Sequence, residues 1–130
     1  MPLNKESTRI LKSILNNLLI IEDNSFIRRN IYTATKEISS IREICLAKSL
    51  QEAISLLKKT QFKLIVLDLK LPDGNGFEIL KMFKDKQVET KIFVFTISTE
   101  LKRICLKYGA FAFYDKSTDF DQLMEALKKA

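Results

Sequence analysis

The sequence contains no histidine and no tryptophan, and it has only two cysteines, three glycines and two prolines. Without histidine, no imidazole can act as a general base or bind zinc. The two cysteines, Cys45 and Cys105, are far apart and each lies in an apolar pattern, which favours reduced, buried thiols in a cytoplasmic protein. Long hydrophobic runs are also lacking, since none approaches the roughly 20 residues of a membrane span. We therefore expect a cytoplasmic location and no membrane partner.

The charge is positive overall, but it is not gathered into a basic motif. The 22 lysines and arginines exceed the 16 acidic residues and give a net charge of +6. The lysines are scattered over positions that would face solvent on helices, and no helix-turn-helix or zinc-finger pattern accompanies them. We interpret the charge as a solvated surface and expect no direct contact with nucleic acid. At 130 residues, with 46% apolar and 29% charged residues, the chain is typical of one globular domain.

Five apolar runs alternate with five amphipathic stretches along most of the chain. We predict strands over residues 18–21, 41–46, 62–67, 92–95 and 111–114, and helices over residues 25–38, 49–60, 76–86, 99–108 and 118–129. The runs are nearly continuous rather than alternating, which indicates a parallel sheet covered on both faces. We expect a doubly wound α/β domain, a three-layer flavodoxin-like sandwich with strand order 2-1-3-4-5. Capping signals accompany the helices: Ser49 with Glu52, Thr118 with Asp121, and Gly109 as a helix stop.

The first 16 residues form an N-terminal extension ahead of the domain at residues 17–130. An apolar stripe at Ile10, Leu11, Ile14 and Leu15 predicts a helix over residues 3–16. This stripe is expected to pack back onto the domain. A surface for self-association or for a partner is the alternative.

The stretch from Phe62 to Gly76 organises the rest of the sequence. A strand-like run ends on Asp68, Pro72 and two glycines interrupt it, and helical spacing resumes at Phe77. The carboxyl ends of parallel strands form the ligand crevice of such folds, so Asp68 is expected at the crevice floor. Taken alone, Asp68 could equally be a residue that begins a turn.

Polar residues follow the other predicted strands at the same edge of the sheet. The whole set is Glu22, Asp23, Asp68, Thr96 and Lys116. Neighbouring first and third strands would bring the three carboxylates together, and their mutual repulsion would be relieved by a cation. Oxygen ligands without histidine or cysteine suit Mg²⁺, to which the backbone carbonyl of Lys70 could add a further ligand. A hydroxyl and an ammonium opposite this cluster suit a bound phosphoryl group.

These residues also carry a resemblance to a known family. The segments are LIIEDN at 19–24, VLDLKLPDGNG at 66–76, FT at 95–96, GA at 109–110 and DK at 115–116. Together they resemble the receiver domain of two-component response regulators, in particular single-domain receivers of the chemotaxis type, over about residues 17–129.

The resemblance implies a role for each matched position. Asp68 would be the phosphoacceptor, Glu22 and Asp23 would hold Mg²⁺, and Lys116 would pair with the phosphoryl oxygens. Thr96 would move to bind one of those oxygens, and Phe113 occupies the position of the aromatic switch residue. The implied partners are a sensor histidine kinase or phosphotransfer protein and a downstream protein target. The chain would act as a monomer or a phosphorylation-dependent homodimer, and it would be no enzyme beyond its own phosphorylation and dephosphorylation.

Two other functions compete with this interpretation. The first is a receiver-like interaction module that is never phosphorylated. The second is a phosphatase with an aspartate nucleophile, which needs an acid two residues after the nucleophile, where this chain has Lys70. Ile97 replaces the small residue usual after the threonine, and we interpret it as restricting small phosphodonors and attacking water.

Overall fold

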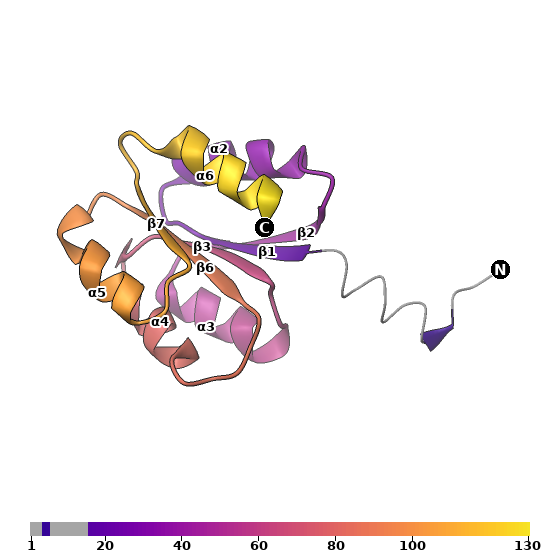
Figure 1. Ribbon diagram of the computed structural model, residues 1–130, viewed down its shortest axis with the longest axis horizontal. Helices are drawn as coiled ribbons and strands as arrows, with labels where there is room; N and C mark the ends of the chain where they lie inside the picture. Colours follow the sequence, from indigo (N-terminus) through magenta and orange to yellow (C-terminus); the bar gives the residue numbers. More distant parts are fainter. Residues whose placement is uncertain (1–3, 6–15) are drawn as a thin grey trace.

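Five parallel strands form the sheet at the centre of the molecule, in the order β2-β1-β3-β6-β7 (Figure 1). The computed structural model describes residues 4–5 and 16–130. The strands are β1 (Asn16–Ile21), β2 (Ile41–Ala47), β3 (Leu64–Leu67), β6 (Lys91–Thr96) and β7 (Ala112–Asp115). Counted among the parallel strands alone, this is the order 2-1-3-4-5, so the predicted doubly wound fold is confirmed. The predicted helix over residues 3–16 lies almost wholly outside the described residues and stays a prediction.

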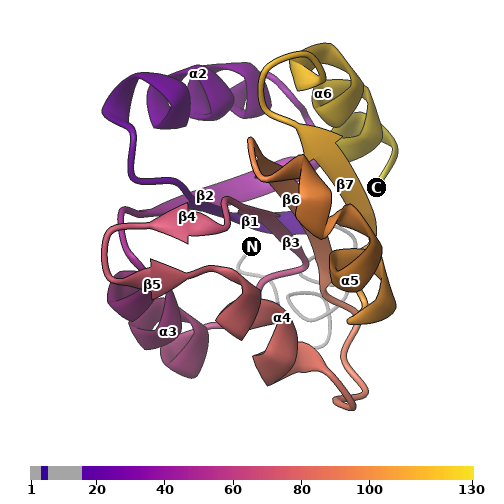
Figure 2. The same cartoon turned by 90° about the vertical axis from the view of Figure 1, so that its left-hand side faces the viewer.

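Helices cover both faces of this sheet (Figures 1 and 2). One face carries α2 (Ser25–Lys36) and α6 (Phe120–Lys129). The other carries α3 (Leu50–Lys59), α4 (Phe77–Phe83), the 3-10 turn η1 (Thr99–Leu101) and α5 (Lys102–Lys107). Within the described part of the chain, no helix is long and apolar enough to cross a membrane.

The apolar runs are continuous because successive side chains enter two different cores. Along β3, Leu64 and Val66 join the core under α2 and α6, whereas Ile65 and Leu67 join the core under α3, α4 and α5. All four side chains are buried. Alternate residues of a strand point to opposite faces, so a strand covered on both faces needs apolar residues throughout.

Several predicted helix ends agree with the structure. The Ser49 hydroxyl accepts a hydrogen bond from the Glu52 N–H at 3.1 Å and caps α3. Gly109 follows the end of α5 with a φ of +95°, in the left-handed region that favours glycine. The predicted capping box of Thr118 and Asp121 is wrong: α6 has Asp119 at its N-cap, without a side-chain capping bond.

The loop after β3 is more ordered than its turn-forming residues indicated. Its residues form a short antiparallel hairpin, β4 (Lys70–Leu71) and β5 (Gly74–Asn75), around a Pro72–Asp73 turn. The helix that follows is shorter than predicted, since α4 ends at Phe83 rather than near Lys86.

Candidate functional site

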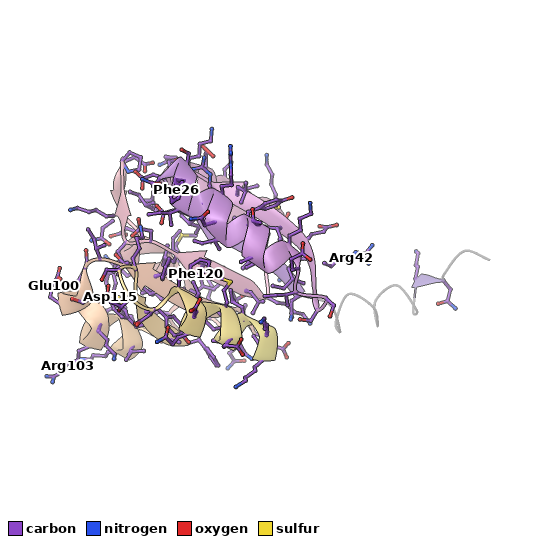
Figure 3. All side chains as sticks on the ribbon, turned by 90° about the horizontal axis from the view of Figure 1, so that it is seen from above. Phe26, Arg42, Glu100, Arg103, Asp115 and Phe120 are labelled. Atoms are coloured by element: carbon purple, nitrogen blue, oxygen red, sulfur yellow. The ribbon has the colours of Figure 1, made fainter. Side chains whose placement is uncertain are left out.

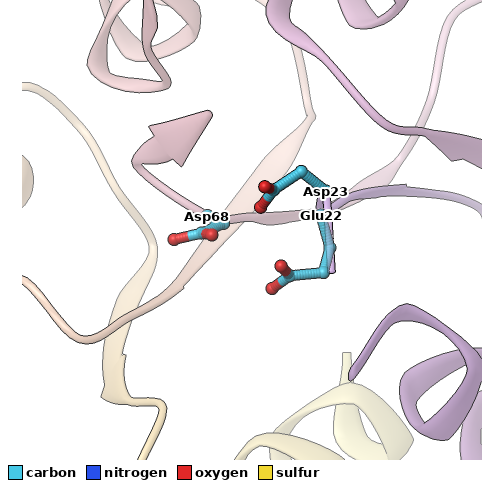
Figure 4. Close-up of side chains that lie close together, drawn as sticks. All are labelled: Glu22, Asp23 and Asp68. Carbon is cyan, nitrogen blue, oxygen red and sulfur yellow. The ribbon is translucent and has the colours of Figure 1, made fainter. Parts of the chain in front are cut away.

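Three carboxylates meet at the carboxyl edge of the sheet. Glu22 and Asp23 follow β1, and Asp68 follows β3, which pairs directly with β1. The Asp68 N–H donates to the Ile21 carbonyl at 3.0 Å and extends the ladder by one residue. One oxygen of each carboxylate lies within 4.8 Å of the others (Figure 4). The acidic triad that the sequence predicts is therefore present.

Lys116 brings an ammonium group to the same point from the end of β7. Its Nζ atom lies 2.6 Å from Glu22 Oε1 and 2.9 Å from Asp68 Oδ2. Both acids are buried, Glu22 with 1% and Asp68 with 2% of its surface exposed, whereas Asp23 is exposed. The lysine thus joins two buried acids while the third acid is exposed to solvent.

Burial and neighbouring charges shift the pKa values of Glu22 and Lys116. Burial raises the pKa of Glu22, and the charge of Asp68 raises it further, although bonds to Lys116 and to the Asn24 backbone oppose this. Burial tends to lower the pKa of Lys116, but its bonds to Asp68 and Glu22 outweigh that effect, so its pKa is raised. Three carboxylates and one ammonium leave an excess of negative charge when all are ionised.

Local structure fixes the first two acids. The Asn24 N–H donates to Glu22 Oε2 at 3.1 Å, and the Asn24 side chain caps α2. Arg28 donates from Nη1 to the backbone carbonyls of Glu22 at 2.9 Å and Asp23 at 3.2 Å. The role of Arg28 could not be predicted from the sequence, because nothing in a helical pattern shows that a side chain folds back over the loop before the helix.

The remaining predicted residues lie around this centre. Lys70 begins β4 and its N–H donates to Asp68 Oδ1 at 3.3 Å. Thr96 is fully buried at the end of β6, and its hydroxyl accepts from the Ser98 N–H at 3.3 Å. Phe113 is half-buried on β7 and packs against the core under α3, α4 and α5. The roles predicted for these residues stay predictions.

The residues at the centre fit a hard divalent cation. They offer carboxylate oxygens only, from Glu22, Asp23 and Asp68, with Asp23 open to solvent. Mg²⁺ prefers such ligands and keeps several waters, which can reach the exposed side of the cluster at Asp23. Burial is the main cause of the raised pKa of Glu22, and a divalent cation would offset the smaller contribution that the charge of Asp68 adds to it.

Comparison with known proteins agrees with this geometry. A sequence model described as the response regulator receiver domain matches residues 18–128. The chain belongs to the response regulator receiver domain family. Nitrate/nitrite response regulator protein NarL of Escherichia coli K12 is 28% identical over 115 residues, covering 87% of this receiver domain and 53% of NarL. The receiver domain thus spans about half the length of NarL.

Other relatives match the receiver domain over nearly their whole length. Sporulation initiation phosphotransferase F of Bacillus subtilis is 27% identical over 118 residues, covering 89% of this chain and 94% of that protein. Thermotoga maritima response regulator TrrA, solved in complex with Mg²⁺ and BeF, is 25% identical with a TM-score of 0.76 and covers 88% and 98% of the two chains. A CheY-like receiver domain protein of Methanospirillum hungatei JF-1 is 26% identical with a TM-score of 0.77, covering 88% and 92%.

The perturbed Glu22 makes the stability of the metal-free receiver domain depend on pH. Since the pKa of Glu22 is higher in the folded state than its ordinary value of 4.5, the folded state binds more protons above that pH. The free energy of unfolding should therefore fall as the pH rises from about 4.5 towards neutrality. Glu22→Gln should flatten this slope and raise the melting temperature at pH 7 by a few degrees, measured by circular dichroism with a chelator present.

A matched control is Glu125→Gln, because Glu125 is an exposed acid that pairs with Lys128 at 3.2 Å. Its loss should leave the slope unchanged. The lowered pKa values of Asp73 and Asp115 affect stability only below their ordinary value of 3.8 and so outside this window. A wild-type melting temperature that rises between pH 5 and pH 7 would contradict the prediction.

Proposed function

We propose that the chain accepts a phosphoryl group on Asp68 in a two-component system, with Mg²⁺ held by Glu22, Asp23 and Asp68. The observation that carries this proposal is the position of Lys116, whose ammonium touches both Asp68 and Glu22 inside the acidic cluster. Such a group compensates the negative charge that arrives with a phosphate. The backbone carbonyl of Lys70 is proposed as a further ligand, since the adjoining main chain already bonds the Asp68 carboxylate.

The proposed step is nucleophilic catalysis by a carboxylate. An Asp68 oxygen forms a bond to the phosphorus of a phosphohistidine while the phosphorus–nitrogen bond breaks and the imidazole nitrogen takes the electron pair. Lys116 holds the Asp68 carboxylate in position and stabilises the charge on the transferring oxygens. A bound Mg²⁺ would supply the remaining charge compensation in the loose transition state.

The phosphorylated state would be read through Thr96 and Phe113. Among the described residues, the one hydrogen bond that the Thr96 hydroxyl would lose is the 3.3 Å bond from the Ser98 N–H. Thr96 lies on β6, the strand next to β3. A movement of Thr96 towards the phosphoryl oxygens would leave space beside β7, which Phe113 would enter from its half-buried position. The switch would alter the surface formed by α5 and β7.

The donor and the output are proposed to be proteins in the cytoplasm. Phe26 is 71% exposed on the first turn of α2, three residues after Asp23, and Ile97 is 55% exposed directly after Thr96. Figure 3 shows Phe26, Glu100 and Asp115 towards one end of the molecule and Arg42 towards the other. Exposed apolar side chains beside a charged site suit a histidine kinase or phosphotransfer protein. The chain would catalyse only its own phosphorylation and dephosphorylation, and its output would be contact with a downstream target.

Beryllofluoride and Mg²⁺ test this proposal without a kinase. We expect wild-type protein to bind beryllofluoride, seen as a new bound signal in fluorine NMR, and to gain one phosphoryl group from acetyl phosphate or phosphoramidate, seen by mass spectrometry. Asp68→Asn should abolish both, because an amide is a poor nucleophile. If saturating Mg²⁺ and beryllofluoride give no bound signal, the chain is an interaction module that is never phosphorylated.

A further inference from the structure

The hairpin of β4 and β5 connects the candidate site to a distant helix. It begins directly after Asp68 and Leu69, and its Pro72–Asp73 turn reaches the N-terminus of α3. Leu69 and Leu71 are buried, so the hairpin is packed onto the domain. Gly74 lies so close to α3 that a β-carbon there would be 2.9 Å from a Leu50 methyl group.

The Asp73 carboxylate makes two hydrogen bonds across this contact. Oδ1 accepts from the Leu50 N–H at 2.8 Å, and Oδ2 accepts from the Gln51 N–H at 2.9 Å. These bonds lower the pKa of Asp73. The first turn of a helix has N–H groups without partners inside the helix, and they favour a negative charge. Here a residue 22 to 23 positions away binds two of them with both oxygens.

The same helix start has an independent local cap. Ser49 accepts from the Glu52 N–H at 3.1 Å through its hydroxyl, and its carbonyl accepts from the Ala53 N–H at 3.1 Å. Helix α3 therefore already has the usual N-cap residue. The helix does not depend on the two additional bonds from Asp73 for its cap, so these bonds also hold the hairpin in place against α3.

The other end of the hairpin lies at the phosphoacceptor. The Lys70 N–H donates to Asp68 Oδ1 at 3.3 Å, and the Gly76 N–H donates to the Leu69 carbonyl at 2.7 Å. Lys70 pairs with Asn75 across the hairpin, one residue before Gly76. A movement of the Pro72–Asp73 turn away from α3 would therefore also move the main chain at Lys70.

We propose that Asp73 is a positioning residue of the receiver domain, which clamps the hairpin to the N-terminus of α3 and so holds the main chain at Lys70 in place for Mg²⁺. This inference rests on the proposed function. It assigns Asp73 no contact with the cation or the phosphoryl group. Because coupling between two sites is reciprocal, binding of Mg²⁺ must in turn strengthen the clamp.

The first experiment compares Asp73→Asn with Ser49→Ala. Asparagine keeps the size of Asp73 but turns an N–H₂ group towards one of the two helix N–H donors. Ser49→Ala removes a capping bond from the same helix without touching the hairpin. We expect Asp73→Asn to weaken Mg²⁺ binding about tenfold, as supporting residues of metal ligands do. Isothermal titration gives the affinities, and thermal denaturation gives the loss of stability of each variant.

Each outcome bears on a different claim. Wild-type affinity in Asp73→Asn, or equal weakening in both variants, would overturn the clamp and leave the proposed function intact. If the wild type itself binds neither Mg²⁺ nor beryllofluoride, the proposed function fails instead.

A second measurement on the wild type needs no variant, and so it decides the matter even if Asp73→Asn does not fold. Saturating Mg²⁺ should slow amide hydrogen exchange at Leu50 and Gln51, and leave Glu52, which Ser49 caps, unchanged. Equal exchange rates at Leu50 and Gln51 with and without Mg²⁺ would contradict the clamp.

Discussion

Replacing Lys116 with methionine should lower the free energy of unfolding of the metal-free protein at pH 7 by about 3 kcal/mol, because it leaves buried acids without their counter-charge. Methionine has a similar length to lysine, so the substitution leaves little cavity. The lysine is 13% exposed in its side chain and contacts Glu22 and Asp68 at 2.6 and 2.9 Å. Urea denaturation, with a chelator present, measures the loss.

The same variant should separate two kinds of binding. Removing the ammonium raises the negative charge of the acidic triad, so Mg²⁺ should bind more tightly and should restore part of the lost stability. Beryllofluoride should bind more weakly, because the group that compensates the phosphoryl charge is missing. If Lys116 has the proposed role, calorimetric titration should show a higher affinity for Mg²⁺ and a lower affinity for beryllofluoride than in the wild type.

Lys81→Met is the matched control for this prediction. Lys81 pairs with Glu78 at 3.3 Å, but both side chains are about half exposed. Its loss should cost less than about 1 kcal/mol and leave both ligands unaffected. A Lys116→Met protein as stable as the Lys81→Met protein would show that the buried ion pair contributes nothing at neutral pH.

Gly76→Ala is the second substitution with a large expected effect, since a β-carbon at this position would collide with the main-chain carbonyl of Asp68. Gly76 has an ordinary helical backbone, with φ −58° and ψ −17°, so conformational freedom is not what requires glycine. The added carbon would lie inside van der Waals contact of the Asp68 carbonyl oxygen and 2.9 Å from Leu67 Cδ1. The Asp68 main chain is held against β1 by its hydrogen bond to the Ile21 carbonyl, and the Leu67 side chain is fully buried, so neither neighbour can move freely.

We expect Gly76→Ala to destabilise the protein by about 3 kcal/mol, as overpacking does at a rigid contact. It should also displace Asp68 and weaken beryllofluoride binding strongly. Guanidinium denaturation and fluorine NMR measure the two effects.

The control for Gly76→Ala is the same substitution at Gly109, where nothing lies within 4 Å of an added β-carbon but φ is +95°. Gly109→Ala should cost about 1 kcal/mol through backbone strain alone. Beryllofluoride binding should stay at the wild-type level. If Gly76→Ala matched Gly109→Ala in both measurements, the close approach to Asp68 would be unimportant.

The parts of the site that follow strand ends could be predicted because strand ends share one edge of a parallel sheet. Glu22 and Asp68 come directly after an apolar run, Lys116 comes one residue after one, and the strand order brings them together. The positions of those apolar runs were enough to predict both the acidic triad and the ammonium group beside it. The roles of Thr96 and Phe113 depend on a second state and remain predictions.

Contacts made by side chains between elements could not be predicted in the same way. Arg28 bonds two carbonyls in the loop before its own helix, and Asp73 bonds two N–H groups more than 20 residues earlier in the chain. Neither contact follows from the helix or strand periodicity on which the prediction of the elements depends. Thr118 failed as a cap for a related reason: Asp119 holds the Asp115 N–H with one oxygen at 2.9 Å, which ties the start of α6 to the end of β7.

The amino-acid sequence by itself determined the sheet, its layers and the edge at which the charged groups gather, because these depend on where apolar runs begin and end. Tertiary structure alone decided that Lys116 binds Glu22 as well as Asp68, and that the hairpin is anchored through Asp73 to α3. Periodicity records which face of an element is buried. Which polar atoms pair across a gap depends instead on distances between separate elements, and these exist only after the chain has packed.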